Sequence, residues 1–417
     1  PDRKRALNIG GKWLKEGQTI DKGGVIHGEG RNSRIASFWL EGPAAAYQTW
    51  AQLTYKLLTA ENEFEMTGSE ETLKAVTNTD WGLPYLPRSA LEQRRSDELM
   101  ERREEIEKRT VPYGCRFLLA AVDVQGGRNR RFVVQIVGYG ENSERWLIDR
   151  YNIKSSMRSN SEGESLPIDP SAYPEDWDLL ISDVLNKQYR IEGLDGGFMP
   201  ILAMAVDSGG EDGVTDNAYK FWRRCKRDGL SKRVYLVKGD SAKRQKLITR
   251  TYPDNTSRSD RHAKARGDVP LYLLQTDQLK DRISNALSRE TIGANYIHFP
   301  AWLGEWFFDE LTYEERGQDG KWRKPGKGNN EAFDLFCYAH AIAILRGYER
   351  IKWGDEDNVP YWAKLPGLNP DVIRKETTAL EEETESAVEI EQVKPQPKPK
   401  TKSNWLNGGG GKKSGWL

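Results

Sequence analysis

Two aspartates stand where long apolar runs of the sequence end. Asp123 follows the apolar run 117–122, and Asp207 follows the run 201–206. A carboxylate at the end of a buried strand costs free energy unless a partner compensates its charge. In α/β proteins the carboxyl ends of the strands also line the ligand crevice. Asp123 and Asp207 are therefore candidate catalytic residues that share a bound cation.

A third candidate opens the last predicted helix. Asp334 ends the segment 329–334, and Glu331 lies three residues earlier on the same helical face. The first turn of a helix stabilises acidic side chains, so in the simpler interpretation both residues only stabilise the helix start. Taken together with Asp123 and Asp207, we favour Asp334 as the third catalytic residue and metal ligand. Glu331 is a further candidate ligand.

An all-oxygen ligand set of this kind favours Mg²⁺ or Mn²⁺ over zinc. Two such ions at about 3.5–4 Å suit in-line hydrolysis of a phosphodiester, since one activates water and the other stabilises the leaving 3′ oxygen. The sequence therefore predicts two-metal phosphodiester hydrolysis. Four other acids are expected in turns or on the surface: Asp149, Asp195, Asp309 and Glu310.

Composition excludes several other classes of protein. The 417 residues carry no apolar run of about 18 residues, so we expect no transmembrane helix and no membrane partner. Cys115, Cys225 and Cys337 are widely spaced and the histidines show no metal-ligand spacing, so we expect reduced thiols and no zinc site. The length accommodates about two domains. Because the chain begins with Pro1, we expect it to be part of a longer protein.

The formal net charge is zero, but the charge is segregated. The stretch 238–266 is basic and contains glycine, proline and serine, which predicts a long loop. Beside a carboxylate cluster, such a loop would hold DNA phosphates. In the alternative interpretation it is only a solvated charged loop. The candidate DNA-binding residues are Lys243, Arg244, Arg250, Arg258, Arg261, Lys264 and Arg266.

The elements around these residues alternate between strands and helices. Strands are expected at 116–124, 131–139, 145–151, 201–206, 233–237 and 271–274, and helices at 177–189, 215–227, 277–288 and 330–346. This order predicts an α/β domain with a central mixed sheet flanked by helices. A mainly helical segment precedes it, with helices expected at 44–60, 70–76 and 91–108.

After residue 350 the hydrophobic periodicity is lost. Glutamates dominate 376–391, and lysine then alternates with proline. Such a composition cannot bury enough apolar surface to fold alone, so we expect a disordered tail. Trp405 and Trp416 near its end favour a docking peptide, although the alternative is that they have no specific role.

Three passages together resemble the large subunit of tailed-phage DNA-packaging terminase, of the lambda type. The passage from IASFWL (35–40) to NTDWGLP (78–84) is similar to the end of the family's packaging ATPase and its approach to the nuclease. LLAAVDVQ (118–125) is similar to the strand with the first nuclease aspartate. AVDSGG (205–210) and NEAFD (330–334) are similar to the second and third acidic motifs. The resemblance covers roughly residues 30–350.

This resemblance implies an RNase H-like nuclease fold with metal ligands at Asp123, Asp207 and Asp334. It implies the end of the ATPase domain and a linker at 1–110, the endonuclease domain at 111–350, and a tail for portal docking at 351–417. The implied function is to cut concatemeric double-stranded viral DNA into genome lengths during packaging into the procapsid. The Walker motifs are absent here, so ATP use as the packaging motor is expected only of the full-length protein.

The implied partners are double-stranded phage DNA, the small terminase subunit and the portal protein, to which Trp405 and Trp416 would bind. An oligomer is expected on the portal, and the cytoplasm of the infected bacterial host is the expected location. Two alternatives stay open: a non-catalytic docking module of a packaging motor, and a resolvase- or transposase-like nuclease of the same fold. The segment 33–85 argues against the latter, because such enzymes do not need it.

Overall fold

The computed structural model describes residues 2–88, 95–210, 212–240, 246–252, 268–317 and 319–375. The chain divides into two compact units, Pro1–Glu376 and Thr377–Leu417, and the second unit lies wholly outside the described residues. The predicted tail with Trp405 and Trp416 lies in that second unit. The domain boundaries at 110 and 350 stay predictions.

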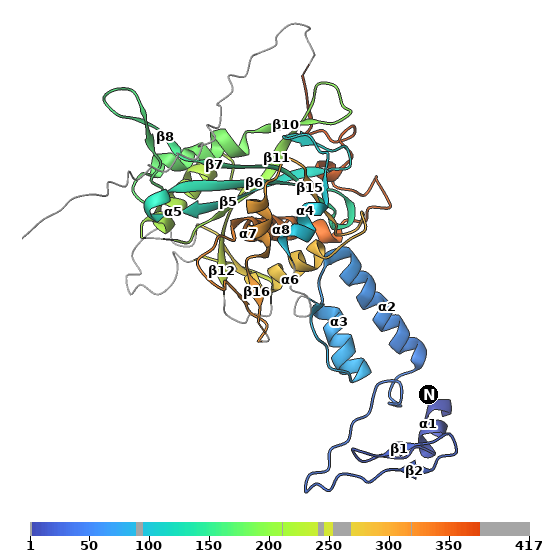
Figure 1. Ribbon diagram of the computed structural model, residues 1–417. Coiled ribbons are helices and arrows are strands. Elements are labelled where there is room, and N and C mark those ends of the chain that lie inside the picture. The colour runs from blue at the N-terminus through green and yellow to red at the C-terminus, as the bar shows by residue number, and fades with distance from the viewer. Residues whose placement is uncertain are drawn as a thin grey trace, which may run out of the picture. The chain divides into compact units, whose positions relative to one another are not determined.

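A mixed sheet forms the centre of the first unit (Figure 1). β5 (Phe117–Gln125), β6 (Arg131–Tyr139) and β7 (Arg145–Ile153) form an antiparallel meander. β11 (Gly197–Asp207) lies parallel to β5 on its other side, and β12 (Val234–Asp240) lies parallel to β11. In the order β7-β6-β5-β11-β12, only β6 is antiparallel to the others. This is the RNase H-like arrangement that the resemblance implied.

Further strands extend this core to a 12-stranded sheet. β14 (Leu271–Gln275) and β13 (Ile248–Thr251) follow β12 at one edge. At the other edge, β15 (Ile297–Pro300) and β3 (Arg103–Glu104) follow β7. The first half of β11 also pairs with β10 (Gln188–Ile191) and β18 (Ile373–Arg374), and β4 (Thr110–Val111) pairs with β10.

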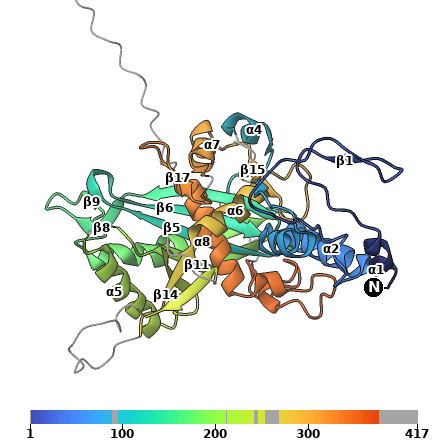
Figure 2. The ribbon, with the colours of Figure 1, turned by 90° about the horizontal axis from the view of Figure 1, so that it is seen from below.

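Helices cover both faces of the sheet. Because successive side chains of a strand point to opposite faces, each central strand contributes to the core on both sides. Ala121 and Ala205 belong to the core with α6 (Thr276–Leu287), α7 (Glu305–Thr312) and α8 (Glu331–Leu345). Figure 2 shows α8 crossing this face. The neighbouring positions Val122 and Val206 belong to the core on the opposite face, beneath α5 (Val214–Arg227) and the short helical turns η5 (Pro174–Asp178) and η6 (Ile181–Leu185).

The segment before the sheet is mainly helical, as predicted. Its elements are α1 (Asp2–Ile9), β1 (Thr19–Ile20), β2 (Ile26–His27), α2 (Trp50–Thr67), α3 (Glu71–Ala75), η1 (Val76–Trp81) and α4 (Ser96–Glu101). The helix expected at 44–60 begins only at Trp50, because Thr49 and Gln52 form a capping box there. It continues until Gly68, whose φ of 70° ends it. None of the described helices is long and apolar enough to cross a membrane.

The remaining elements are short: η3 (Gly127–Asn129), η4 (Glu141–Ser143), β8 (Ser155–Ser159), β9 (Ser165–Pro167), β16 (Glu315–Arg316), β17 (Trp322–Arg323), η8 (Tyr348–Arg350) and η9 (Tyr361–Ala363). All three cysteines are buried and free.

Two predicted helices are only partly right, and one predicted gap is wrong. Of the helix expected at 91–108, the described residues form only the six-residue α4 and then β3, which joins the sheet edge. The helix expected at 177–189 is helical as far as Leu185, in η5 and η6, and β10 replaces its end, with residues that alternate between exposed and buried as they pair with β11. After residue 350, where no element was expected, η9 and β18 pack against the domain. For β3 and β18, pairing with a strand far away in the sequence outweighs the local pattern.

Candidate active site

Asp207 is the last residue of β11, and Asp123, two residues before the end of β5, lies at the same level. β5 and β11 are parallel, and Val122 pairs with Val206 immediately before the two aspartates. Two positions before each aspartate the strand places an alanine in the core beneath α8. Because side chains alternate along a strand, both carboxylates face α8. The structure therefore brings these two residues together at the carboxyl edge of the sheet, as the sequence predicted.

Asp334 approaches this edge from the first turn of α8, which packs on β5, β6 and β11. Lys280 Nζ lies 2.8 Å from Asp334 Oδ1, and Asn330 Nδ2 donates to Asp334 Oδ2 at 2.8 Å. The same two groups also donate to Glu314: Lys280 Nζ to Oε2 at 2.5 Å and Asn330 Nδ2 to Oε1 at 2.5 Å. The third carboxylate is thus fixed in orientation by two donors that are fixed themselves.

The three carboxylates act on one another electrostatically. Burial raises the pKa of Asp123 to about 7, and the negative charges of Asp207 and Asp334 add to this shift. The hydrogen bond from Gln125 Nε2 opposes it. Burial also raises the pKa of Asp207, against the Gly209 N–H that donates to Asp207 Oδ1 at 2.9 Å. Repulsion among buried carboxylates is what a bound cation relieves.

Glu331 adds a fourth carboxylate one turn before Asp334. It is 5% exposed, and Arg131 Nη2 donates to its Oε1 at 3.0 Å. Its other oxygen, Oε2, is buried and has no hydrogen-bond partner within the described ranges. A buried carboxylate oxygen without a partner is costly, and it points to a ligand at that place. The charge of Glu331 also raises the pKa of Asp123.

Two acids expected on the surface are instead partnered in the interior. Asp149 is fully buried, and its Oδ2 accepts hydrogen bonds from the Tyr189 hydroxyl at 3.1 Å and Arg109 Nε at 3.2 Å. Glu310 accepts from Arg150 Nη2 at 2.8 Å and from the backbone N–H of α8 at 2.9 Å. The expectation for these two is wrong, because cations far away in the sequence compensate their charge. Asp195 and Asp309 are exposed, as predicted.

By their chemistry, these residues fit a hard cation. The donors that face α8 are carboxylate oxygens, and Glu331 Oε2 is unsatisfied. Asp334 accepts one donor on each oxygen, so each retains a lone pair. Across the described part of the chain, however, no three His, Cys, Asp or Glu side chains stand close enough to form a ready-made metal site. The ligand set Asp123, Asp207, Asp334 and Glu331 stays a prediction.

Only a part of the predicted DNA-binding surface can be placed. Arg250 lies exposed on β13, with its guanidinium carbon 5.0 Å from the centre of the Tyr252 ring. The other predicted contacts lie outside the described residues: Lys243, Arg244, Arg258, Arg261, Lys264 and Arg266. Lys238 is exposed on β12, and its charge lowers the pKa of Asp207. This lysine puts positive charge on the strand next to Asp207.

Sequence reasoning missed Lys280 and Glu314. Lys280 is 7% exposed, and it lies on the buried face of α6 between Leu279 and Ile283. A lysine among apolar residues at helical spacing is expected to be buried, and a buried lysine needs a carboxylate partner. This pattern in the sequence could have identified Lys280. Nothing in the sequence near Glu314 identifies it as that partner.

Three comparisons with known proteins each gave a match. The family described as "Terminase large subunit gpA, endonuclease domain" matches residues 35–353. The "Terminase, large subunit" of Escherichia phage lambda is 27% identical over 316 residues, which are 72% of this chain and 42% of that protein. A solved structure of the large terminase from a thermophilic bacteriophage is 13% identical with a TM-score of 0.31, over 71% of this chain and 53% of that one. The chain thus spans less than half of the lambda protein's length.

Proposed function

Because the chain belongs to the endonuclease-domain family of the phage terminase large subunit gpA, we propose that it hydrolyses phosphodiester bonds of double-stranded viral DNA. The observation that carries this proposal is the convergence of Asp123, Asp207 and Asp334 at one end of the sheet. The raised pKa of Asp123 supports it, since perturbed carboxylates gather at functional sites.

Asp123, Asp207 and Asp334 would hold Mg²⁺ or Mn²⁺, with Glu331 as a further ligand. Two such ions, when bound, supply an activated water and charge stabilisation at the leaving 3′ oxygen. The chain's own residues prepare this site. Lys280 and Asn330 orient Asp334.

The other two carboxylates are oriented from their own strands. The Gly209 N–H donates to Asp207, and the Gln125 amide donates to Asp123. The apolar layer between the sheet and α8 keeps bulk water away from one side of the carboxylates. These contacts reduce the reorganisation that binding and reaction require.

DNA would approach over the basic residues beyond Asp207. Lys238 and Arg250 are described there, and Lys243, Arg244, Arg258, Arg261, Lys264 and Arg266 complete the proposed contacts with phosphates. In the whole protein, this nuclease would cut concatemers into genome lengths in the host cytoplasm, next to an ATP-driven motor. The small terminase subunit and the portal would be its partners, the latter through Trp405 and Trp416.

The proposal is tested by cleavage of a supercoiled plasmid by the purified chain with Mn²⁺, Mg²⁺ or EDTA. The same assay is run with Asp207→Asn and with Asp195→Asn, a matched control in an exposed turn. We expect nicked and linear products with metal only, from the wild type and Asp195→Asn but not from Asp207→Asn. Cleavage that persists in EDTA, or in Asp207→Asn, would refute the proposed mechanism.

A non-catalytic docking module is the second candidate. The ion pair between Lys280 and Asp334 favours it, because an ammonium group already satisfies one carboxylate in place of a metal ion. If neither the wild type nor Asp207→Asn cleaves DNA under any condition, and if the longer protein that contains the chain does not cleave either, this second candidate replaces the nuclease.

A further inference from the structure

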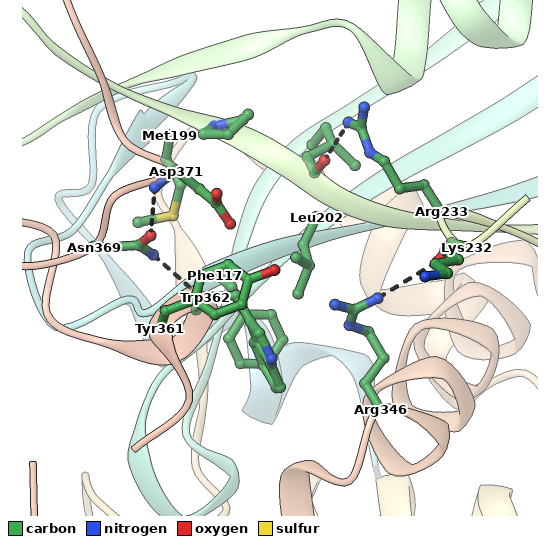
Figure 3. Close-up of a pocket in the computed structure, with 12 residues that line it drawn as sticks. Phe117, Met199, Leu202, Lys232, Arg233, Arg346, Tyr361, Trp362, Asn369 and Asp371 are labelled. Atoms are coloured by element: carbon green, nitrogen blue, oxygen red, sulfur yellow. Dashed lines mark hydrogen bonds between the residues drawn. The ribbon is translucent and has the colours of Figure 1, made fainter. Parts of the chain in front are cut away.

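A pocket of about 400 Å³ lies at the opposite ends of the strands and helix that carry the aspartates (Figure 3). Phe117 begins β5, and Leu202 lies in the first half of β11. Along β11, Leu202 and Asp207 are about 17 Å apart at about 3.3 Å per residue. No step of the proposed cleavage involves this pocket, so its use is a separate question.

The floor of the pocket is apolar. Phe117, Ile201 and Trp362 are buried there, and Leu202 is partly buried beside them. Tyr361 stands at the mouth with 58% of its surface exposed. A concave apolar floor with an exposed aromatic ring at its rim suits one large apolar group of a ligand.

One wall of the pocket is cationic. Lys232, Arg233 and Arg346 line it, together with Asp371, whose charge favours Arg233 without forming an ion pair with it within the described ranges. Arg233 Nη2 donates to the Ile201 carbonyl at 2.7 Å, and Arg346 Nη1 donates to the Lys232 carbonyl at 3.5 Å. Figure 3 shows all three on the same side of the pocket. Neutral carbonyl groups thus hold the two arginines without compensating their charge.

Two further observations concern the cost of burying the arginines at this wall. Arg346 Nε is buried and has no hydrogen-bond partner among the described residues, although the guanidinium carbon lies 5.2 Å from the centre of the Trp362 ring. Burial lowers the pKa of Arg233, and the charge of Arg346 lowers it further, against the opposing effect of Asp371. An anionic ligand would remove both costs.

We propose that this pocket binds a short segment of a partner protein in which one large apolar side chain is flanked by acidic residues. The apolar floor takes the anchor, and the cationic wall takes the carboxylates. Tyrosine, tryptophan and arginine, which dominate the rim and wall, are the residue types that supply most binding energy at protein interfaces.

Fluorescence anisotropy with labelled hexapeptides tests the proposal on the intact chain. Each probe has Leu, Phe or Trp as an anchor between glutamates. Matched probes have lysines in place of the glutamates or glycine in place of the anchor. We expect at least one acidic probe to bind, and both changes to weaken that binding by about tenfold or more. If no acidic probe binds at about 1 mM, or if lysine probes bind equally, the proposal is wrong.

Variants place the binding in this pocket. Arg346→Gln and Tyr361→Ala should each weaken binding of the acidic probe by about tenfold, whereas Lys352→Gln should not. Lys352 is an exposed lysine that lies between Arg346 and Tyr361 in the sequence and does not line the pocket. If Arg346→Gln lowers the melting temperature, Lys232→Gln takes its place, since that side chain is exposed. Equal binding by all variants, or displacement of the probe by dAMP at similar concentration, would overturn the assignment to an acidic peptide.

Discussion

The two ends of the central strands carry opposite charge on the same apolar frame. At the carboxyl end, Asp123, Asp207 and Asp334 approach one another, and burial together with the charges of the other two aspartates raises the pKa of Asp123. At the other end, Arg233 and Arg346 lie above an apolar floor and donate hydrogen bonds to neutral carbonyl groups, with Asp371 as the nearby acid. Between them the strands are almost fully buried. The difference teaches that burial fixes the strands, whereas the charge at their ends sets the proposed ligand of each end: a cation at one and an anion at the other.

The largest effect is expected from removing charge at the carboxyl end. Asp123→Asn should reduce metal-dependent plasmid cleavage by about a hundredfold or more, because it removes a proposed metal ligand. Lys352→Gln, which changes one exposed charge near the other end, should leave cleavage unchanged. Initial rates at saturating Mn²⁺ measure both. A similar loss in the two variants would mean that the ends are not functionally distinct.

The buried ion pair at the carboxyl end should make a large contribution to stability. Lys280→Met leaves Asp334 and Glu314 without their shared cation, and we expect a loss of about 3 kcal/mol in the free energy of unfolding. Lys74→Met, which changes an exposed helical lysine, is the matched control. Urea unfolding measures both variants. The double variant Lys280→Met/Glu314→Gln should recover part of the loss, and equal stability of the single variant and the wild type would contradict the account.

Stability should depend on pH through Asp123 when no divalent ion is present. Its pKa is about 7 in the folded chain and about 3.9 when unfolded, so the folded state holds the extra proton between these values. Stability contributed by this group is therefore present below pH 4 and falls as the pH rises to about 7. Thermal unfolding in EDTA should show this decline, and Asp123→Asn should reduce it. Added Mg²⁺ should stabilise the wild type most above pH 7, where no proton competes.

The smallest effect is expected from Arg250, an exposed residue of the proposed DNA-binding surface. Arg250→Gln should lower the slope of log affinity against log salt for duplex DNA by about 1, as the loss of one phosphate contact predicts. Because Arg250 is exposed, its removal should not change the melting temperature. Anisotropy titrations at several salt concentrations provide the slope. An unchanged slope would remove Arg250 from the DNA-binding surface.

The sequence predicts best where long apolar stretches are buried. The strand expected at 131–139 is β6 as found, and the helix expected at 330–346 is α8 within one residue at each end. The positions of Asp123 and Asp207 follow from such stretches, because a strand that runs through the core places its last residue at the edge. If the two strands are parallel neighbours, the two aspartates are also expected to lie side by side at the same edge of the sheet.

What the sequence could not predict depends on partners distant along the chain. β3 is a strand because the distant β15 pairs with it, and β10 pairs with the neighbouring β11 and with the distant β4. Glu310 is partly buried because Arg150 compensates its charge, and Lys280 is buried because Glu314 and Asp334 do the same. The pocket at the opposite end is lined by residues of β5 and β11, of the end of α8 and of the segment 361–371. These segments are far apart in the sequence, so no local pattern predicts the pocket.

The central claim is that the three aspartates form one metal centre, and a Mn²⁺ titration followed by electron paramagnetic resonance tests it most directly. We predict that the wild type and Asp195→Asn deplete free Mn²⁺ to the same extent, and that Asp123→Asn, Asp207→Asn and Asp334→Asn each weaken this binding by about tenfold or more. Equal binding by the wild type and all three variants would contradict a metal centre at this end of the sheet.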